Sequence, residues 1–324
     1  MKRKIPKPST TRLMVKRLIR IGARKSALSI RQSKWVKDRL VELHPGIEVE
    51  LVKITTRGDK ILDSPLAVIG GKGLFVKEIE EALTEARADI AVHSMKDMPA
   101  ELPAGLIIGA VPKREDPFDA LVGKGDTLAQ LRQGARVGTS SLRRRAQLKY
   151  LRPDLTIEPL RGNVDTRLRK LDEGKYDAIV LAVAGLVRMG LDNRVVEHLC
   201  PPDFLPAVGQ GALALEIRED DDLTRELIAP IEDTTTRAVT SAERAFLAEL
   251  QGGCQVPIAA YASVDGDSMH LAGMVADIDG SIMIKDDIEG KPQEAENLGR
   301  ELARRLLDAG AAQILDEIYG NKEK

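Results

Sequence analysis

The chain is 324 residues long, enough for two or three domains, and with 43% apolar and 31% charged residues its composition is that of an ordinary globular protein. Its 49 basic and 50 acidic residues leave a net charge of −1, and only 3% of the residues are aromatic, which together argue against a dedicated nucleic-acid binder. The two cysteines, Cys200 and Cys254, lie far apart in the sequence, which argues against a disulfide framework or a metal cluster and favours a reducing compartment. No internal repeat or low-complexity segment stands out.

The first 17 residues are basic and rich in lysine, proline and threonine. They lack the apolar core of a secretion signal, and no apolar run in the chain approaches the length of a membrane span. We therefore expect residues 1–17 to be a disordered extension on a cytoplasmic protein that does not enter a membrane. An organellar transit peptide would also be basic and poor in acids, so this alternative stays open.

The first predicted unit begins with a buried strand at residues 18–22, a turn that contains Arg24 and Ser26, and a helix that runs to about Leu43. One apolar stripe along this helix contains Leu28, Trp35, Val36, Leu40 and Leu43. Gln32 lies near the middle of the stripe, where a buried amide needs hydrogen-bond partners. It therefore either braces neighbouring backbone or faces a polar cleft.

A second strand at residues 48–55 ends at Thr56, and residues 61–73 form a predicted loop whose most flexible part is Gly70-Gly71-Lys72-Gly73. These glycines suit a moving segment, and they lack the spacing of a phosphate-binding P-loop. A helix follows, and its apolar face contains Phe75, Ile79, Leu83 and Ala86.

A short strand at residues 89–93 leads into Ser94-Met95-Lys96-Asp97. In an open α/β sheet, ligands bind beyond the carboxyl ends of the strands. Lys96 and Asp97 are therefore candidate site residues, although such a pair, taken alone, is more often part of a solvated turn. Another strand at residues 106–111 and a polar hinge at residues 113–117 follow.

A second unit starts after this hinge, with strands at residues 120–122 and 135–137. Thr139, Ser140 and Ser141 then offer hydroxyls that can cap a helix, and Arg143 and Arg144 lie in its first turn. Hydroxyls, guanidiniums and the amide groups of a helix start all favour a carboxylate or a phosphate, so the pattern predicts an anion site. The alternative is a helix with a solvated basic face, but arginine in a first turn opposes the helix dipole unless an anion is bound.

The order of strand, basic turn and helix occurs again, because Arg161 follows a strand at residues 155–159 and Arg167 lies in the early turns of the next helix. Residues 177–184 form an apolar strand that is typical of a parallel sheet buried on both faces. Cys200 lies in a connector and is assigned no role. A strand at residues 212–217 indicates that the chain returns to the first unit, so the two crossings near residues 114 and 208 form a hinge.

A helix at residues 237–250 leads directly to Gly252-Gly253-Cys254, and its inward face contains Val239, Ala242, Phe246 and Leu250. The two glycines leave the sulfur accessible, and Pro257 stops the helix from resuming. A reactive loop thiol and a small buried hydrophobe are equally compatible with this spacing. Beyond Pro257, alternating strands with turns at residues 265–266 and 279–280, and helices at residues 292–319, predict a small α+β domain.

Five motifs occur in the order found in the porphobilinogen deaminase (hydroxymethylbilane synthase) family, which the chain closely resembles over residues 18–319. They are His93-Ser94-Met95-Lys96-Asp97, Gly138-Thr139-Ser140-Ser141-Leu142-Arg143-Arg144, Leu160-Arg161-Gly162-Asn163-Val164, Val208-Gly209-Gln210-Gly211 and Gly252-Gly253-Cys254-Gln255-Val256-Pro257. The resemblance implies two α/β domains similar to periplasmic binding proteins and a small C-terminal α+β domain. We expect domain 1 at residues 18–113 and 208–231, domain 2 at residues 114–207 and domain 3 at residues 232–324.

The resemblance also implies a transferase that joins four porphobilinogen molecules head to tail into linear hydroxymethylbilane, with release of ammonia, in tetrapyrrole and haem biosynthesis. It implies a dipyrromethane cofactor held by a thioether to Cys254, with Asp97 as the catalytic carboxylate. The residues implied to bind the cofactor are Lys96, Thr139, Ser140, Ser141, Arg143, Arg144 and Arg161. Those implied to bind substrate are Arg24, Ser26, Gln32, Arg167 and Gln210. Arginine suits the many pyrrole carboxylates, because its planar fork binds carboxylate through two hydrogen bonds.

The resemblance gives no reason to expect a metal, a nucleic acid or a membrane as partner, and we expect a monomer. The main rival is a solute-binding or ligand-sensing module, because a fold of this kind does not fix function. Such a module would need neither the Gly-Gly-Cys loop nor a covalent adduct. No role is assigned to Asp59, to Arg145, or to Val68, where some relatives of the family have lysine.

Overall fold

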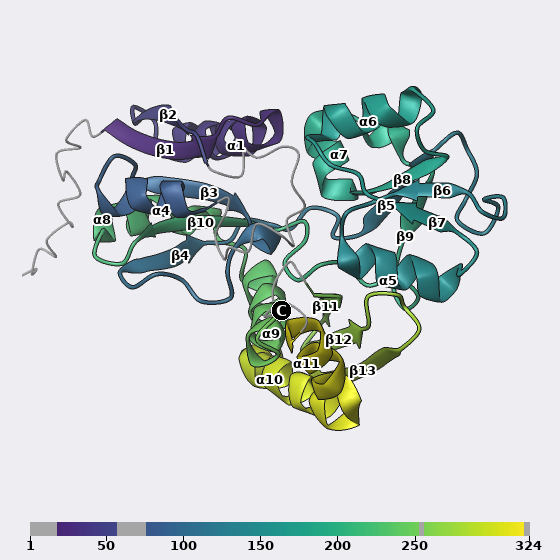
Figure 1. Cartoon of the computed structure of the whole chain (residues 1–324). Helices are drawn as coiled ribbons and strands as arrows, with labels where there is room; N and C mark the ends of the chain where they lie inside the picture. Colours follow the sequence, from purple (N-terminus) through teal and green to yellow (C-terminus); the bar gives the residue numbers. More distant parts are fainter. Residues whose placement is uncertain (1–17, 57–75, 253–255, 321–324) are drawn as a thin grey trace, which may run out of the picture.

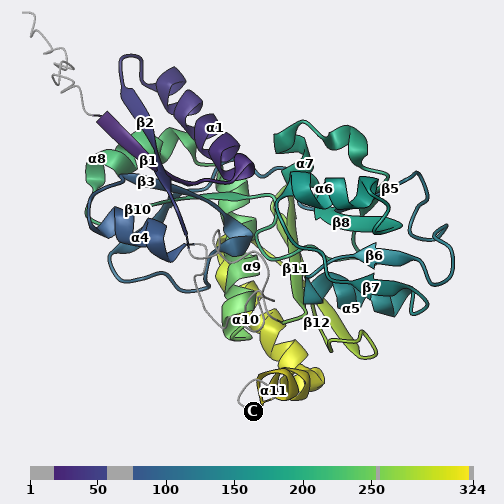
Figure 2. The same ribbon diagram turned by 45° about the horizontal axis from the view of Figure 1, so that its top comes forward.

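The computed structural model describes residues 18–56, 76–252 and 256–320. Within these ranges the chain forms two five-stranded sheets and one three-stranded sheet. The two larger sheets lie side by side, and the third unit packs beneath both of them (Figures 1 and 2). The predictions for residues 1–17, for Asp59, for the loop at residues 61–73, for Phe75 and for Cys254 fall outside the described residues.

The first sheet has the strand order β2-β1-β3-β10-β4. Its strands are β1 (Leu18–Arg24), β2 (Glu48–Ile54), β3 (Ile90–Ser94), β4 (Leu106–Ala110) and β10 (Leu213–Arg218). Its helices are α1 (Ala27–Leu43), α4 (Lys77–Thr84) and α8 (Asp222–Ile228). β1 pairs in parallel with both β2 and β3, so the carboxyl ends of β1 and β3, at Arg24 and Ser94, meet at the same edge of the sheet.

The second sheet has the strand order β7-β6-β8-β5-β9. Its strands are β5 (Asp119–Gly123), β6 (Arg136–Gly138), β7 (Thr156–Glu158), β8 (Ala178–Ala182) and β9 (Glu197–Leu199). Its helices are α5 (Leu142–Leu151), α6 (Val164–Asp172) and α7 (Val183–Met189). β6 is parallel to β7 and β8, so the turns that begin α5 and α6 also leave from one edge.

Both sheets are mixed. The apolar strand predicted at residues 177–184 is β8, which pairs in parallel with β6 as expected but antiparallel with β5. β10 runs antiparallel to β3 and β4, and β5 runs antiparallel to β8 and β9. These are the strands by which the chain enters a sheet directly after crossing from the other unit. β9 was not predicted, and residues 183–184 begin α7 where the sequence pattern indicated a continuing strand.

Two predicted core positions are exposed. Trp35 is 48% exposed, because the buried stripe of α1 follows Ser29, Gln32, Ser33, Val36 and Leu40, and Trp35 lies one residue, or about 100° of helix rotation, to the side. Ala86 lies beyond the end of α4 at a φ of 54°, and Ala82 occupies the buried position instead. Val36, Leu40, Ile79 and Leu83 are buried as predicted, whereas Leu28 and Leu43 are only partly buried.

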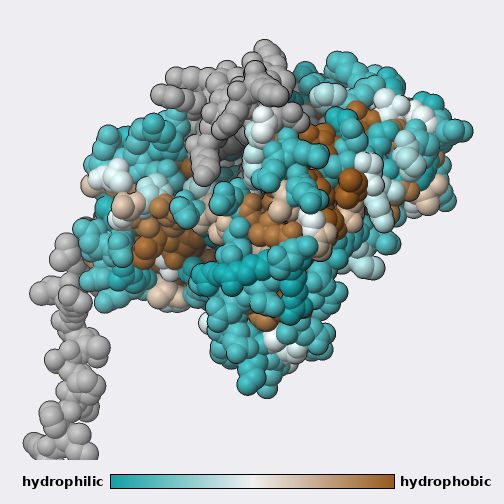
Figure 3. Space-filling model, turned by 60° about the horizontal axis from the view of Figure 1, so that its bottom comes forward, coloured by the Kyte–Doolittle hydropathy of each residue, from teal (hydrophilic) through white to brown (hydrophobic). Residues whose placement is uncertain are grey.

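The third unit is an antiparallel sheet covered by helices, as predicted. It contains β11 (Ile258–Asp265), β12 (Ser268–Ala276), β13 (Met283–Gly290), α9 (Thr234–Glu249), α10 (Ala295–Leu306) and α11 (Ala312–Gly320). Val239, Ala242, Phe246 and Leu250 are all buried in its core, which confirms the predicted inward face of α9. Hydrophilic residues cover most of the face shown in Figure 3, and apolar residues gather there in separate patches. Within the described ranges, no helix is both long and apolar enough to cross a membrane.

The same pair of hydrogen bonds between an arginine and an aspartate joins corresponding strands in the two larger sheets. In the first sheet the backbone N–H of Arg20 donates to the Asp89 carboxylate at 2.9 Å, and the N–H of Asp89 donates to the Arg20 carbonyl at 2.8 Å. In the second sheet Arg136 and Asp177 make the same two bonds, at 2.7 and 2.9 Å. Each aspartate thus fixes the strand that follows it against the first strand of its parallel set.

Glu243 of α9 ties the two crossings to the third unit. Its side chain is fully buried, and its carboxylate accepts hydrogen bonds from both terminal nitrogens of Arg114 at 2.7 and 3.1 Å. The same carboxylate accepts from the N–H of Gly209 at 2.7 Å and from the N–H of Ala262 at 2.9 Å. Since Arg114 lies in the first crossing and Gly209 in the second, one carboxylate holds both connections and β11 together.

Replacing Glu243 by glutamine should destabilise the fold strongly, because it leaves the buried Arg114 guanidinium without its counter-charge. The expected loss in the free energy of unfolding is about 3–5 kcal/mol, measured by urea denaturation. The matched control is Glu296→Gln, which breaks the exposed pair between Glu296 and Arg300 and should cost at most about 1 kcal/mol. Similar small losses for both variants would show that the buried pair does not hold the crossings.

Candidate functional site

A small pocket lies at the edge of the first sheet where β1 and β3 end. It has a volume of about 60 Å³, and its lining includes Arg24, Ser26, Gln32 and Asp97. Ser26 builds the pocket wall by capping α1, since its hydroxyl accepts a hydrogen bond from the N–H of Ser29 at 3.3 Å. The structure thus brings together four of the residues that the sequence marked as site candidates.

Gln32 is buried and faces this pocket. Its side-chain amide donates to the hydroxyl of Ser94 at 2.9 Å. Of the two alternatives left open by the sequence, the structure therefore supports the polar cleft, because the partner of Gln32 is a side chain at the carboxyl end of β3 and not neighbouring backbone. Ser94 itself was not among the predicted site residues.

Asp97 is exposed at the end of a firmly held turn. The turn is the 3₁₀ helix η1 (Met95–Asp97), and the N–H of Met95 donates to the carbonyl of Ala212 at 3.0 Å. Gly209 lies directly against it, since a Cβ on Gly209 would come within 2.8 Å of the Met95 side chain, and its φ of +70° also favours glycine. The backbone under Asp97 is therefore fixed while its side chain is exposed.

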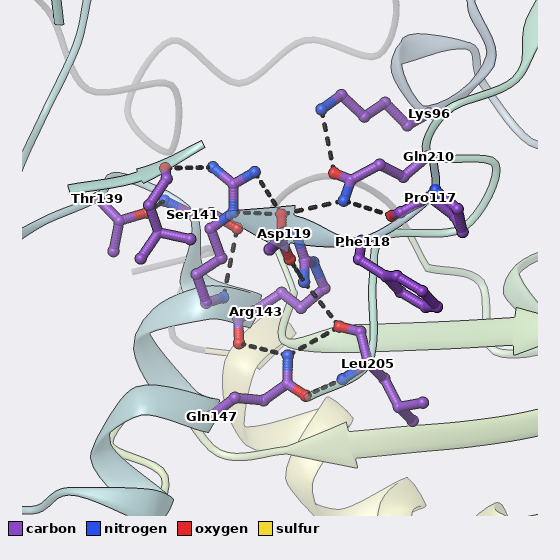
Figure 4. A network of polar contacts seen from close by, with 12 residues as sticks. Lys96, Pro117, Phe118, Asp119, Thr139, Ser141, Arg143, Gln147, Leu205 and Gln210 are labelled. Carbon is purple, nitrogen blue, oxygen red and sulfur yellow. Dashed lines mark hydrogen bonds and ion pairs between the residues drawn. The ribbon is translucent and has the colours of Figure 1, made fainter. Parts of the chain in front are cut away.

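On the side of the second sheet, a buried carboxylate organises the basic residues (Figure 4). Asp119, at the start of β5, accepts from Arg143 at 2.6 Å, from Arg144 at 2.6 Å and from the Gln210 amide at 3.0 Å. Burial alone would raise the pKa of Asp119, but the two guanidiniums overcome this effect and hold its pKa well below its usual range. Two arginines face one aspartate, so the group keeps an excess positive charge.

Arg143 and Arg144 therefore have a structural role that the sequence did not reveal. Arg143 also donates to the carbonyl of Leu205 at 2.7 Å, and Arg144 to that of Val180 at 2.9 Å. Substituting either arginine should affect stability as well as ligand binding, because Asp119 would lose a buried partner. One feature of the sequence could have indicated this role: Asp119 stands at the start of an apolar strand, and a carboxylate buried there requires a cation as partner.

The three predicted hydroxyls shape the turn in front of α5. Ser141 caps the helix by accepting from the N–H of Arg144 at 3.4 Å, and Thr139 accepts from the N–H of Ser141 at 3.2 Å. Ser140 donates to the carbonyl of Leu160 at 3.0 Å and accepts from its N–H at the same distance. The Ser140 contacts link this turn to the turn that contains Arg161.

Arg161 and Arg167 extend the positive charge toward Asp97. Burial and the positive charges of Arg144 and Arg161 together lower the pKa of Arg167 to about 10, against the opposing effect of the Asp97 charge. Arg167 also donates to the carbonyl of Gly162 at 2.7 Å. The Nη1 atom of Arg161 is buried and has no hydrogen-bond partner among the described residues. A buried donor beside further cations fits a bound carboxylate.

Lys96 and Gln210 connect the two halves of the site. The ammonium group of Lys96 donates to the Gln210 side-chain oxygen at 3.2 Å, and the Gln210 amide reaches Asp119, as Figure 4 shows. Burial lowers the pKa of Lys96 to about 8, with Asp97 and Asp119 opposing the shift and Arg144 and Arg143 adding to it. A side chain of the first unit thus belongs to the same electrostatic group as the arginines of the second.

Two family domains and several curated proteins match most of this chain. Residues 19–226 match the family domain described as "Porphobilinogen deaminase, dipyromethane cofactor binding domain", and residues 238–308 match "Porphobilinogen deaminase, C-terminal domain". The chain is 55% identical over 307 residues to the porphobilinogen deaminase of Syntrophobacter fumaroxidans, covering 94% of this chain and 99% of that protein. It is 57% identical over 298 residues to that of Syntrophotalea carbinolica, covering 92% and 95%.

Solved structures with a coarser likeness include a periplasmic aliphatic sulphonate binding protein from Escherichia coli. It is 18% identical with a TM-score of 0.39, and the match covers 72% of this chain and 70% of that one. A periplasmic binding protein from Salmonella typhimurium with high arginine specificity is 15% identical with a TM-score of 0.40, covering 68% and 94%.

Lys96 should lose its charge near pH 8 in protein that has no ligand carboxylates, because its pKa is lowered from 10.5 to about 8. In protein prepared without cofactor, the rate at which Lys96 reacts with an amine-acetylating reagent should therefore rise up to about pH 8 and level off by pH 9, as measured by peptide mass spectrometry. Ordinary lysines, with a pKa near 10.5, should keep rising through this interval. Cofactor-loaded protein is the control, since bound carboxylates favour the ammonium form and should move the rise to higher pH. A rate at Lys96 that keeps rising in parallel with the other lysines of the cofactor-free protein would contradict the lowered pKa.

Proposed function

The chain belongs to the porphobilinogen deaminase family, and from this membership we propose how its own residues carry out the reaction. The enzyme polymerises porphobilinogen in tetrapyrrole biosynthesis and contains the family's dipyrromethane cofactor binding domain. The product is linear hydroxymethylbilane, and ammonia is released as each of four units is joined.

We assign domain 1 to residues 18–113 and 208–231, domain 2 to residues 114–207 and domain 3 to residues 232–324. The pairing of β10 with β3 and β4 supports the return of the chain to domain 1, and the pairing of β5 with β8 and β9 supports a separate domain 2. The contacts of Glu243 support a hinge at the two crossings.

Cys254 is the proposed attachment point of the cofactor. Support comes from the approach to it: α9 is anchored by the buried Leu250, and the N–H of Gly252 donates to the carbonyl of Leu247 at 2.9 Å. Residues 250–252, which directly precede the segment with Cys254, are therefore held against the end of α9. When bound, the dipyrromethane supplies the terminal pyrrole carbon to which the next porphobilinogen is joined.

The buried Nη1 atom of Arg161 is the observation that best supports carboxylate binding in this site. Each pyrrole unit has acetate and propionate groups, and a carboxylate beside Arg161 would satisfy this donor. The cofactor residues we propose are Lys96, Thr139, Ser140, Ser141, Arg143, Arg144 and Arg161. The substrate residues we propose are Arg24, Ser26, Gln32, Arg167 and Gln210.

Asp97 is the proposed catalytic residue. It lines the pocket with Arg24 and acts electrostatically on Arg167, so its carboxylate lies between the two halves of the site. There it can hold a proton at the leaving amine and stabilise the positive charge that develops on the substrate pyrrole nitrogen. A solute-binding module would have no use for an exposed carboxylate among carboxylate-binding arginines. We further propose a cytoplasmic monomer that uses no nucleic acid. The two distant cysteines support a reducing compartment, and the near-neutral charge argues against a nucleic-acid partner.

Purified protein should be heavier than its sequence by one dipyrromethane unit, located on the peptide that contains Cys254. Intact-mass and peptide mass spectrometry test this directly. Cys254→Ala should fold and lack the added mass, and Cys200→Ala is the matched control that should keep it. An unmodified mass in active enzyme, or an adduct on Cys200, would exclude the attachment at Cys254.

Asp97→Asn should keep the fold and the cofactor but turn over about 10²–10⁴-fold more slowly, the usual cost of losing a positioned acid or base. Asparagine keeps the shape of aspartate but cannot supply its negative charge. Single-turnover conversion of porphobilinogen by cofactor-loaded variant and parent measures the effect, and near-equal rates would remove Asp97 from the chemistry. Asp165→Asn, in the first turn of α6, is a control that neutralises an exposed aspartate and should leave the rate unchanged.

A further inference from the structure

Behind the pocket at the end of β3, an imidazole and a carboxylate form a buried pair. Nε2 of His93 lies 2.8 Å from the carboxylate of Glu216 on β10, and their side chains are 4% and 0% exposed. His93 lies opposite Ala214 in the ladder, and Glu216 is two residues further along β10, on the same face of the sheet. A polar pair in the core of a sheet requires an explanation, because apolar residues of the same size would pack there without the free-energy cost of removing polar groups from water.

The pair does not satisfy all of its own polar atoms. The second carboxylate oxygen of Glu216 is buried and has no hydrogen-bond partner among the described residues, and the same is true of one oxygen of Glu80 on α4. Burial raises the pKa of Glu80, the negative charge of Glu216 raises it further, and His93 opposes the shift. His93 and Glu80 therefore both lie within electrostatic reach of the same buried carboxylate.

The pair lies directly beneath the turn that presents Asp97. His93 lines the same pocket as Asp97 and precedes Ser94, the partner of Gln32. On the far side of the turn, Arg244 of α9 donates through Nη2 to the carbonyls of Pro99 at 2.9 Å and Ala100 at 2.8 Å. The negative charge of Glu216 also acts on Arg244, which is mostly buried. Arg244 thus holds one end of the segment at residues 94–100, and the other end follows His93. Glu216 contacts His93 directly and acts on Arg244 through its charge.

We propose that His93, Glu216 and Arg244 are positioning residues for the deaminase reaction, which hold the turn at residues 94–100 so that the Asp97 carboxylate keeps its place in the pocket. This inference rests on the proposed role of Asp97. The charge of Glu216 orients the imidazole on one side and balances the guanidinium on the other. Since Arg244 belongs to α9, the same contacts fix Asp97 relative to the helix that precedes Cys254.

The test uses the cofactor-loaded enzyme with Glu216→Gln, His93→Gln and the double variant. Glutamine keeps the approximate shape of glutamate but removes its charge. Each single variant should load the cofactor, keep KM within a few-fold and lose roughly 10-fold to 100-fold in kcat, because a misplaced catalytic group costs up to about 100-fold. The double variant should be no slower than the slower single variant, since residues that act as a unit are not additive.

Two further readouts separate positioning from simple core filling. Amide hydrogen exchange of the peptide that contains residues 94–100 should accelerate in the variants, while a peptide from β12 should not change. The pH dependence of kcat should also change, because each substitution alters a polar or charged group beside other titratable side chains. The charge of Glu216 acts on Glu80 from α4 and on Arg244 from α9, and His93 lines the pocket together with Arg24 and Asp97. Loss of activity in step with loss of folded protein, with unchanged exchange and an unchanged pH profile, would overturn the proposal.

The chain offers a matched control in a second pair of the same chemistry. Nε2 of His270 lies 3.1 Å from the carboxylate of Asp287 on the exposed face of the third sheet. His270→Gln and Asp287→Asn should leave kcat and its pH dependence unchanged. If Glu216→Gln does not fold, Arg244→Lys replaces it, because lysine keeps the charge but cannot reproduce the guanidinium contacts; wild-type kcat in this variant would refute the proposal. A parent enzyme without deaminase activity would refute the proposed function instead.

Discussion

The carboxylate of Asp119 is the point on which the arrangement of the candidate site depends. It binds Arg143 and Arg144 from α5 and, through Gln210, reaches Lys96 of the first unit. Without this buried charge, two guanidiniums and an ammonium group in one region would repel one another and turn toward solvent. With it, they stay in place and retain a net positive charge. The basic side chains are thus held in position before any ligand carboxylate arrives, which reduces the entropy that binding must remove from them.

A second buried carboxylate performs the corresponding task at the hinge. Glu243 binds Arg114 in one crossing and Gly209 in the other, and it belongs to the helix that approaches Cys254. Gln210, next to Gly209, is the residue that links Lys96 to Asp119. The hinge, the helix that approaches the proposed cofactor cysteine and the arginine group are therefore joined through adjacent residues. A change in the angle between the two larger units would therefore alter the contacts at the hinge, at the helix that precedes Cys254 and in the arginine group.

Much of this molecule could be predicted from local sequence patterns, because strands, helix caps and apolar faces depend on neighbouring residues. Ser26 and Ser141 cap the helices that the sequence indicated, and the motifs that carry the family resemblance contain the candidate site residues. The buried carboxylates could not be predicted in the same way. Asp119 is 24 residues from Arg143, and Glu243 is 129 residues from Arg114. Nothing local to either acid identifies its partner. The exposure of Trp35 was missed for a related reason, since small polar residues complete the buried stripe of α1.

The two larger units share more than an arrangement of strands and helices. Arg20 with Asp89, and Arg136 with Asp177, make the same pair of backbone bonds at equivalent strands. In each unit the strand that contains the arginine runs into a serine-capped helix. The protein is thus built on an internal pseudo-symmetry that is not evident in the residue pattern. The two larger units therefore each contribute a basic, serine-capped turn. Such a repeated arrangement would suit a ligand that is itself a chain of repeating, identical acidic units.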